Sequence, residues 1–298
     1  MVQNKRILVI YTGGTFGMLK NEKGDGKDTE QKVLYKIYEY EELKDSSDFT
    51  MDDWLTQARD IKKYYHDYDG FVVLHGTDTT AYGASILSFM LESVGKTVVL
   101  TGAQIPIFQP RSDGNNNLLC AILIAATQHI PEVTIYAFDS PNFPALLEAK
   151  ATLDVDPKML IHPPGSVPNE CRLHDKLCRK VYILKMAPTI TPELIRAVFS
   201  GMEGVVLETY GNGNIPIKRK DIYKEIEAAV KNKVLVVNVT QCINGTLLLE
   251  CGVVPAYDMT AEAAWAKLCY VLTKTELSYE EKVKLMKTNI RGEMYNPH

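Results

Sequence analysis

Short apolar runs alternate with longer stretches whose apolar positions recur about every 3.6 residues, the period of a helix. The runs predict buried strands at residues 7–11, 71–75, 97–101 and 133–136. The helical spacing predicts helices between them, at residues 51–66, 80–93 and 115–128. Nearly continuous apolar strands suit a parallel sheet that is covered on both faces. The order of these elements therefore predicts an α/β domain with a doubly wound parallel sheet.

A second, shorter series of the same kind follows. It predicts strands at residues 181–185, 204–207 and 234–238, and helices from Thr191-Pro192, at residues 220–232, at residues 260–272 and after Ser278. Between the two series, residues 154–180 are rich in proline, histidine and charge and show no periodicity. We therefore expect an N-terminal domain at residues 1–165 that carries the threonine motifs described below. A smaller C-terminal α/β domain is expected at residues 180–298.

Composition and charge exclude some classes of binding partner and of protein. The chain has 298 residues, 46% apolar and 23% charged, which is ordinary for a globular protein. Its 33 basic and 37 acidic residues give a net charge of -4, which argues against a broad nucleic-acid or anionic-membrane surface. There is no apolar run of membrane-span length and no secretory signal pattern, and six cysteines are scattered along the chain. These features predict a cytoplasmic protein without a disulfide framework or a metal site.

Two polar clusters follow predicted strands, where ligands of open α/β sheets bind. The first is Thr12-Gly13-Gly14-Thr15, a turn with open backbone N–H groups and two hydroxyls, which matches neither GxGxxG nor a P-loop. The second runs from His75 to Thr79 and includes Thr77 and Asp78, which can place a hydroxyl or bind a cationic amine. Structural alternatives are a plain turn for the first and a helix N-cap for the second. His75 itself is interpreted as a buried, hydrogen-bonded turn residue.

A third cluster combines acids and hydroxyls before the helix at residues 51–66. It consists of Asp45, Ser46, Ser47 and Asp48. Such groups can hold the charged amino and carboxylate ends of an amino acid, although a capped loop has the same residue types. Three clusters of this kind in one chain, two of them at strand ends, favour a binding site over three unrelated turns.

Eight motifs in order along almost the whole chain give a family resemblance. They are YTGGTFGM (11–18), DSSDFT (45–50), GFVVLHGTDTTAY (70–82), LTGAQIP (100–106), VLETYGNGNIP (206–216), NVTQC (238–242), DMTAEAAWAKLCYVL (258–272) and RGEM (291–294). With these motifs the chain resembles the L-asparaginase family, in its cytosolic, bacterial type I-like branch. The resemblance implies hydrolysis of the side-chain amide of L-asparagine to L-aspartate and ammonia. It implies no cofactor and no metal, and assembly into a homodimer or homotetramer.

Matching positions imply the roles of individual residues. Thr15 becomes the nucleophile that forms an acyl intermediate, and Thr77 the second catalytic threonine, with Asp78 beside it holding the substrate amino group. The cluster at residues 45–48 matches the substrate-binding segment: Ser46 and Ser47 contact the substrate carboxylate, and Asp45 and Asp48 flank them. Ala103 contributes its backbone carbonyl near the amide nitrogen. A hydroxyl nucleophile needs a neighbour that removes its proton.

The chain departs from the family pattern in three places. The family completes its second triad with a lysine between the strand at residues 133–136 and the DSPNFP motif (139–144), but no lysine occurs between Lys96 and Lys150. The family's long lid loop is short here, at residues 19–32, and Glu208 replaces an arginine that binds an allosteric asparagine in bacterial members. Two alternatives to an active asparaginase stay open, the first because of the absent lysine and the short lid. One is an amino-acid-binding pseudoenzyme of the same fold, and the other is an ammonia-releasing subunit of an amidotransferase.

Overall fold

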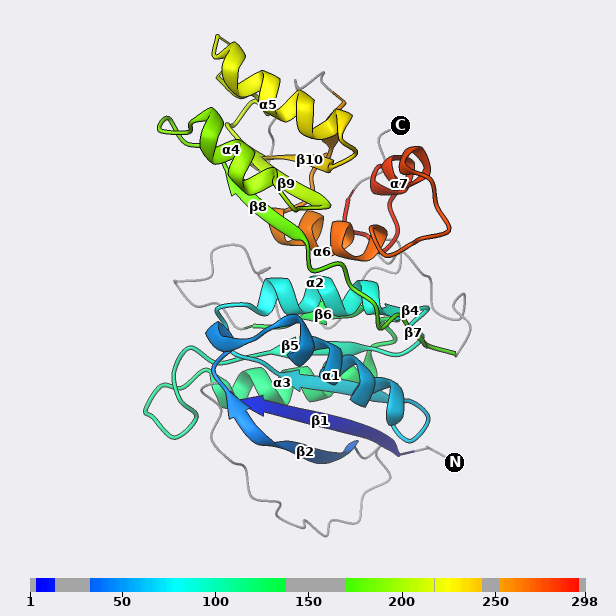
Figure 1. Ribbon diagram of the computed structural model, residues 1–298. Helices are drawn as coiled ribbons and strands as arrows, with labels where there is room; N and C mark the ends of the chain where they lie inside the picture. Colours follow the sequence, from blue (N-terminus) through cyan, green and yellow to red (C-terminus); the bar gives the residue numbers. More distant parts are fainter. Residues whose placement is uncertain (1–3, 14–32, 138–169, 217, 243–251, 295–298) are drawn as a thin grey trace. The chain divides into compact units, whose positions relative to one another are not determined.

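The computed structural model describes residues 4–13, 33–137, 170–216, 218–242 and 252–294 (Figure 1). The chain divides into two compact units, Met1–Asp175 and Lys176–His298. Each unit is built on its own parallel sheet, which confirms the α/β fold class. The finer domain limits at residues 165 and 180 stay a prediction. No helix among the described residues is long and apolar enough to cross a membrane.

The first unit contains a five-stranded sheet in the order β2-β1-β3-β5-β6. All neighbouring strands are parallel, and they are β1 (Lys5–Gly13), β2 (Val33–Lys44), β3 (Gly70–Leu74), β5 (Val98–Thr101) and β6 (Val133–Ile135). The predicted strands of this half are all present, within one or two residues. Because β1 lies inside the sheet with β2 and β3 on either side, the carboxyl ends of β2, β1, β3 and β5 meet along one edge.

Helices cover both faces of this sheet. They are α1 (Met51–Lys63), α2 (Thr80–Met90) and α3 (Gly114–Thr127). One face, with Val9 and Val72, packs against Leu118 and Ala121 of α3 in a buried apolar cluster. On the other face Phe71 stacks on Tyr65, just after α1, with 6.1 Å between the ring centroids. Burial on both faces explains why these strands are nearly continuous apolar runs.

Two elements of this unit differ from the sequence prediction. Strand β2 was not predicted, because its lysines, glutamates and tyrosines show no apolar run and most of its residues are partly or fully exposed. It stands at the sheet edge, where polar side chains are tolerated. The helix expected at residues 80–93 ends at Met90, because Leu91–Glu92 (β4) pairs with Arg172–Leu173 (β7) as a two-stranded antiparallel ribbon.

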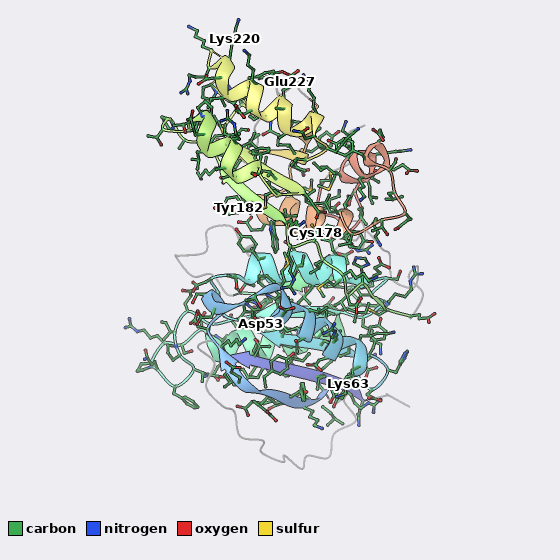
Figure 2. The ribbon with its side chains drawn as sticks, viewed as in Figure 1. Asp53, Lys63, Cys178, Tyr182, Lys220 and Glu227 are labelled. Atoms are coloured by element: carbon green, nitrogen blue, oxygen red, sulfur yellow. The ribbon has the colours of Figure 1, made fainter. Side chains whose placement is uncertain are left out.

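The second unit contains a four-stranded parallel sheet in the order β11-β10-β9-β8. Its elements are β8 (Val181–Lys185), α4 (Pro192–Phe199), β9 (Gly204–Thr209), α5 (Lys220–Lys231), β10 (Leu235–Thr240), β11 (Val254–Pro255), α6 (Ala261–Val271) and α7 (Tyr279–Met286). Ile222 and Ile226 of α5 are buried, while Lys220 and Glu227 lie off this face (Figure 2). The predicted helix starts are confirmed: Thr191 and Ser278 accept N-terminal backbone N–H groups, and Ser278 forms a capping box with Glu281.

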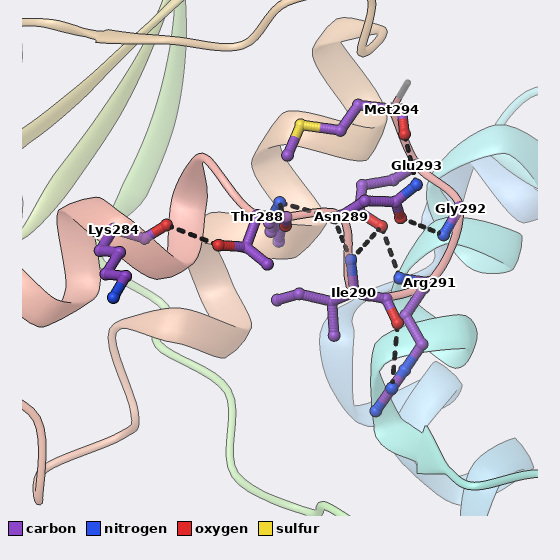
Figure 3. A network of polar contacts seen from close by, with 9 residues as sticks. Lys284, Thr288, Asn289, Ile290, Arg291, Gly292, Glu293 and Met294 are labelled. Carbon is purple, nitrogen blue, oxygen red and sulfur yellow. Dashed lines mark hydrogen bonds and ion pairs between the residues drawn. The ribbon is translucent and has the colours of Figure 1, made fainter. Parts of the chain in front are cut away.

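A buried ion pair holds the end of the described chain against α6, and Figure 3 shows the polar contacts of Glu293 with Ile290 and Arg291 beside it. Lys267 Nζ lies 2.5 Å from Glu293 Oε1, and these side chains are 0% and 5% exposed. Lys267 also donates to the Thr288 carbonyl, and Glu293 accepts from the backbone N–H groups of Ile290 and Arg291. A buried charge needs such partners. The RGEM motif is thus fixed from within the second unit.

Candidate active site

Three of the polar motifs follow strands that are neighbours in the first sheet. Gly13 ends β1, Asp45 follows β2 and His75 follows β3. The loop that carries Ala103 follows β5, the next strand along. Parallel strands place these segments at one edge, as expected for ligand sites of open α/β sheets.

Hydrogen bonds connect these segments directly. Thr12 Oγ1 donates to the Leu74 carbonyl at 2.8 Å, which ties the end of β1 to the end of β3. The His75 N–H donates to the Thr101 carbonyl, also at 2.8 Å. Thr79 Oγ1 donates to the Ser46 carbonyl at 2.8 Å and so joins the HGTDT turn to the DSSD turn. The structure therefore brings the described parts of all three clusters together.

Two glycines allow this close approach. Gly13 has a φ of +124°, and a Cβ added there would lie 2.2 Å from the Lys44 carbonyl oxygen. A Cβ added at Gly76 would lie 2.5 Å from Ser46 Oγ. Real Cβ atoms do not come so near to other heavy atoms, so neither position accepts a side chain without movement. Gly13 of TGGT and Gly76 of HGTDT are thus required by the close packing at this edge.

The turn at residues 45–48 is internally braced. Asp45 caps the short helix Ser46–Asp48, and its Oδ1 accepts from Ser47 N at 2.9 Å and from Ser47 Oγ at 2.7 Å. Hydrogen bonds from the Ser47 backbone and hydroxyl lower the pKa of Asp45. Ser46 is 1% exposed and faces Gly76, whereas Ser47 and Asp48 are exposed. Asp45 therefore shapes the turn, and Ser47 and Asp48 lie at the surface.

The N-cap alternative for the HGTDT cluster is confirmed in position but not for Thr77 or Asp78, because the last residue of the cluster is the N-cap of α2. The N-cap is Thr79, whose hydroxyl is directed to Ser46 instead of to the helix. Thr77 is half-buried and Asp78 is exposed. Among the described residues, neither the Thr77 hydroxyl nor the Asp78 carboxylate has a hydrogen-bond partner. Polar side chains placed in a tight turn with no internal partner can bind a ligand.

His75 is a buried turn residue, which confirms the interpretation from the sequence. It is 1% exposed, and its Nε2 accepts a hydrogen bond from Trp54 Nε1 at 3.1 Å. Because Nε2 is the acceptor, the proton is on Nδ1, which donates to the Gly76 carbonyl at 2.6 Å. Burial lowers the pKa of His75, so the ring is neutral. It positions Gly76 and offers no lone pair to a substrate.

Acid is expected to destabilise the protein through His75. Its folded pKa is below the unfolded value of about 6.5, so protonation favours the unfolded chain. Stability is complete above about pH 6.5 and falls below it, by up to about 1.4 kcal/mol per pH unit. Denaturant unfolding of the wild type and of His75→Gln between pH 5 and about 8 measures this. The variant is expected to show a shallower acid loss; an equal loss would contradict a neutral, buried ring.

Asp113, directly before α3, holds the loop after β5 and was not among the predicted site residues. Its carboxylate accepts hydrogen bonds from the backbone N–H groups of Gln104 and Ile105. Ala103 in this loop, which was predicted, is 4% exposed. The available signal was Ser112-Asp113-Gly114 before a helical pattern, which reads as a cap. Capping residues rarely attract attention as parts of a site.

Some predicted site residues lie outside the described residues. They are Gly14 and Thr15; the lid at residues 19–32, the DSPNFP motif and Lys150 also lie outside the described residues. In the second unit Glu208 is described: its carboxylate lies 3.0 Å from Lys185 Nζ, and Gln241 Nε2 donates to its carbonyl. No cluster of metal-ligating side chains occurs within the described ranges.

Comparisons with known proteins agree with these motifs. The family models "Asparaginase, N-terminal" and "Glutaminase/Asparaginase C-terminal domain" match residues 6–158 and 180–286. The Escherichia coli K12 protein named L-asparaginase 1 is 38% identical over 340 positions, which cover 98% of this chain and 99% of that protein. An L-asparaginase of Dirofilaria immitis is 42% identical over 296 positions, but this chain spans only 50% of its length.

Solved structures show the same relationship. L-asparaginase I from Vibrio cholerae superposes with a TM-score of 0.84 at 38% identity and covers 98% of this chain and 100% of its own. The thermostable L-asparaginase from Thermococcus kodakarensis gives a TM-score of 0.80 at 32% identity, with 97% and 99% covered. The alignment with the E. coli protein is longer than this chain, so it contains gaps in this chain. The chain belongs to the asparaginase family.

Proposed function

We propose that this chain is an amidohydrolase that converts L-asparagine to L-aspartate and ammonia. The observation that carries the proposal is the hydrogen-bonded union of the DSSD and HGTDT turns at one sheet edge, in a chain of the asparaginase family. The E. coli and Vibrio cholerae relatives that align over nearly their whole length are named L-asparaginases.

The polar groups at this edge suit the two ends of an amino acid. Ser46 and Ser47 contact the substrate carboxylate, and for Ser47 this means that its hydroxyl and N–H exchange Asp45 Oδ1 for the substrate. Asp78, with an unpaired carboxylate among the described residues, binds the substrate α-ammonium group, a charge-assisted pairing. Asp48 adds negative charge beside it, and Asp45 keeps the turn in shape. No metal or other cofactor takes part in this proposal.

Hydrolysis proceeds in two steps. The Thr15 hydroxyl oxygen attacks the side-chain amide carbonyl, and its proton passes to the amide nitrogen, which leaves as ammonia. The resulting aspartyl ester on Thr15 is then cleaved by water, which restores the threonine hydroxyl and releases aspartate. Thr77 assists the proton transfers. Backbone N–H groups near Gly14 and Thr77 stabilise the oxyanion, a contribution of about 3 kcal/mol in comparable sites.

The absent lysine sets the expected rate. Loss of one acid–base group costs about 10²–10⁴-fold in rate, so slow turnover relative to complete family members is expected. The proposal therefore predicts measurable ammonia release at millimolar asparagine, with aspartate formed in equal amounts. Thr77→Val is expected to lower kcat by about 10²-fold or more, while Thr77→Ser, which keeps the hydroxyl, retains most of it.

The same assay separates the rival functions. Calorimetric binding of asparagine with no ammonia or aspartate at any enzyme concentration would contradict the hydrolase and support an amino-acid-binding protein. Preferential ammonia release from glutamine would instead support the amidotransferase alternative. Full activity in Thr77→Val would remove Thr77 from the proposed role.

A further inference from the structure

Asp113 holds the loop that carries Ala103. Its carboxylate accepts hydrogen bonds from Gln104 N, 3.1 Å from each oxygen, and from Ile105 N at 3.1 Å. Asn117 Nδ2 donates both to Asp113 Oδ2, at 3.1 Å, and to the Gly102 carbonyl, at 2.8 Å. Asp113 stands at the N-terminus of α3, where the helix dipole favours a negative charge. The backbone on both sides of Ala103 is therefore fixed by side chains of one helix.

This arrangement determines the direction of the Ala103 carbonyl. The described peptide bonds are all trans, and in a trans peptide the C=O and the following N–H point in opposite directions. Because Gln104 N–H points at Asp113, the Ala103 carbonyl points away from it. Among the described residues, no donor meets this oxygen, although Ala103 is 4% exposed. Backbone carbonyls so placed usually have a partner, so this one is suited to a ligand donor.

The same loop lies against the HGTDT turn. A Cβ added at Gly102 would lie 2.5 Å from the His75 carbonyl oxygen and 3.3 Å from Thr77 Cγ2. We infer that Asp113 is a positioning residue that directs the Ala103 carbonyl to the N–H of the substrate side-chain amide, and that the site thereby selects amides over esters. The inference rests on the proposed function, because it needs asparagine to occupy this edge of the sheet.

Selection follows from hydrogen-bond chemistry. A carboxamide nitrogen presents donors to a fixed carbonyl oxygen, whereas an ester oxygen has none and is repelled by it. Removing the Asp113 carboxylate leaves Gln104 N–H and Ile105 N–H without their shared acceptor, so the Ala103 peptide loses its fixed direction. Discrimination between amide and ester should then fall even if the remainder of the site is intact.

The test compares kcat/KM for L-asparagine with kcat/KM for the β-methyl ester of L-aspartate. In Asp113→Ala, which removes this acceptor, the asparagine-to-ester ratio is expected to fall about tenfold relative to the wild type. Asn117→Ala, which removes a donor to Asp113 and Gly102, should lower the ratio in the same direction, and it serves as the test if Asp113→Ala does not fold. Equal losses for both substrates would show a merely structural role and overturn the inference.

Ser112→Ala is the matched control. Ser112 Oγ donates to the Ile105 carbonyl of the same loop, at 2.8 Å, but does not contact Gln104 N–H, so the ratio of kcat/KM values should stay at the wild-type value.

If the wild type binds asparagine without turnover, the proposed hydrolysis fails and the same comparison is made with Kd values. A tenfold fall in the binding ratio would then support the role of Asp113, and an unchanged ratio would overturn it. Absence of binding to either compound would overturn both proposals.

Discussion

Replacing Thr15 by alanine is expected to lower kcat for asparagine by at least about 10³-fold, the scale on which loss of a nucleophile acts. Alanine removes the hydroxyl that forms the proposed aspartyl ester, and no other proposed role depends on this side chain. KM is expected to change little, because the groups assigned to the substrate ends are in the turns at residues 45–48 and 77–78. Steady-state ammonia release at several asparagine concentrations separates the two parameters.

Thr15→Ser and Thr56→Val are the controls for this prediction. The serine variant keeps a hydroxyl at the same position and should retain activity well above Thr15→Ala. Thr56 is exposed on α1, and among the described residues its hydroxyl donates only to the Asp52 carbonyl. Thr56→Val therefore shows the effect of removing a threonine hydroxyl that has no proposed catalytic role. Activity in Thr15→Ala equal to that in Thr56→Val would show that the nucleophile is elsewhere.

Gly13→Ala is expected to be strongly destabilising. The added Cβ would lie 2.2 Å from Lys44 O and 2.6 Å from Lys44 N, both backbone atoms of the paired strand β2. The φ of +124° adds conformational strain to this overlap. A loss of about 3 kcal/mol or more is expected, which corresponds to a Tm lower by about 6–12 °C.

Gly201→Ala isolates the steric part of this cost. Gly201 also has a positive φ, +81°, but nothing lies within 4 Å of an added Cβ. Its replacement should cost only about 1 kcal/mol, the penalty of the left-handed backbone. Thermal unfolding of both variants measures the difference, and similar Tm losses would contradict the close packing of β1 against the end of β2.

The buried elements could be predicted because their burial requires a recognisable pattern of apolar residues. Strands at residues 7–11 and 71–75 are apolar on both faces, and Ser278 to Glu281 has capping-box spacing; the structure confirms all three. Strand β2 could not be recognised, since an exposed edge strand needs no apolar pattern. The end of α2 was misplaced for a related reason: the pairing of Leu91 with Leu173 is a contact distant in sequence.

The candidate site was predictable as a set of turns but not as a set of contacts. Motif order placed Thr77, Asp78 and Ala103 after neighbouring strands, and the structure brings these turns to one edge. The sequence placed an N-cap in the HGTDT cluster but could not show that it is Thr79, or that the Thr79 hydroxyl binds the neighbouring turn, because this depends on side-chain direction. Asp113 was missed because its partners are backbone N–H groups, which carry no sequence signal.

The most direct test of the account is mass spectrometry of protein quenched with acid during turnover of asparagine. The account predicts a covalent aspartyl group on the peptide that contains Thr15, present in the wild type and absent in Thr15→Ala. An aspartyl group on any other peptide, or sustained turnover by Thr15→Ala, would contradict it.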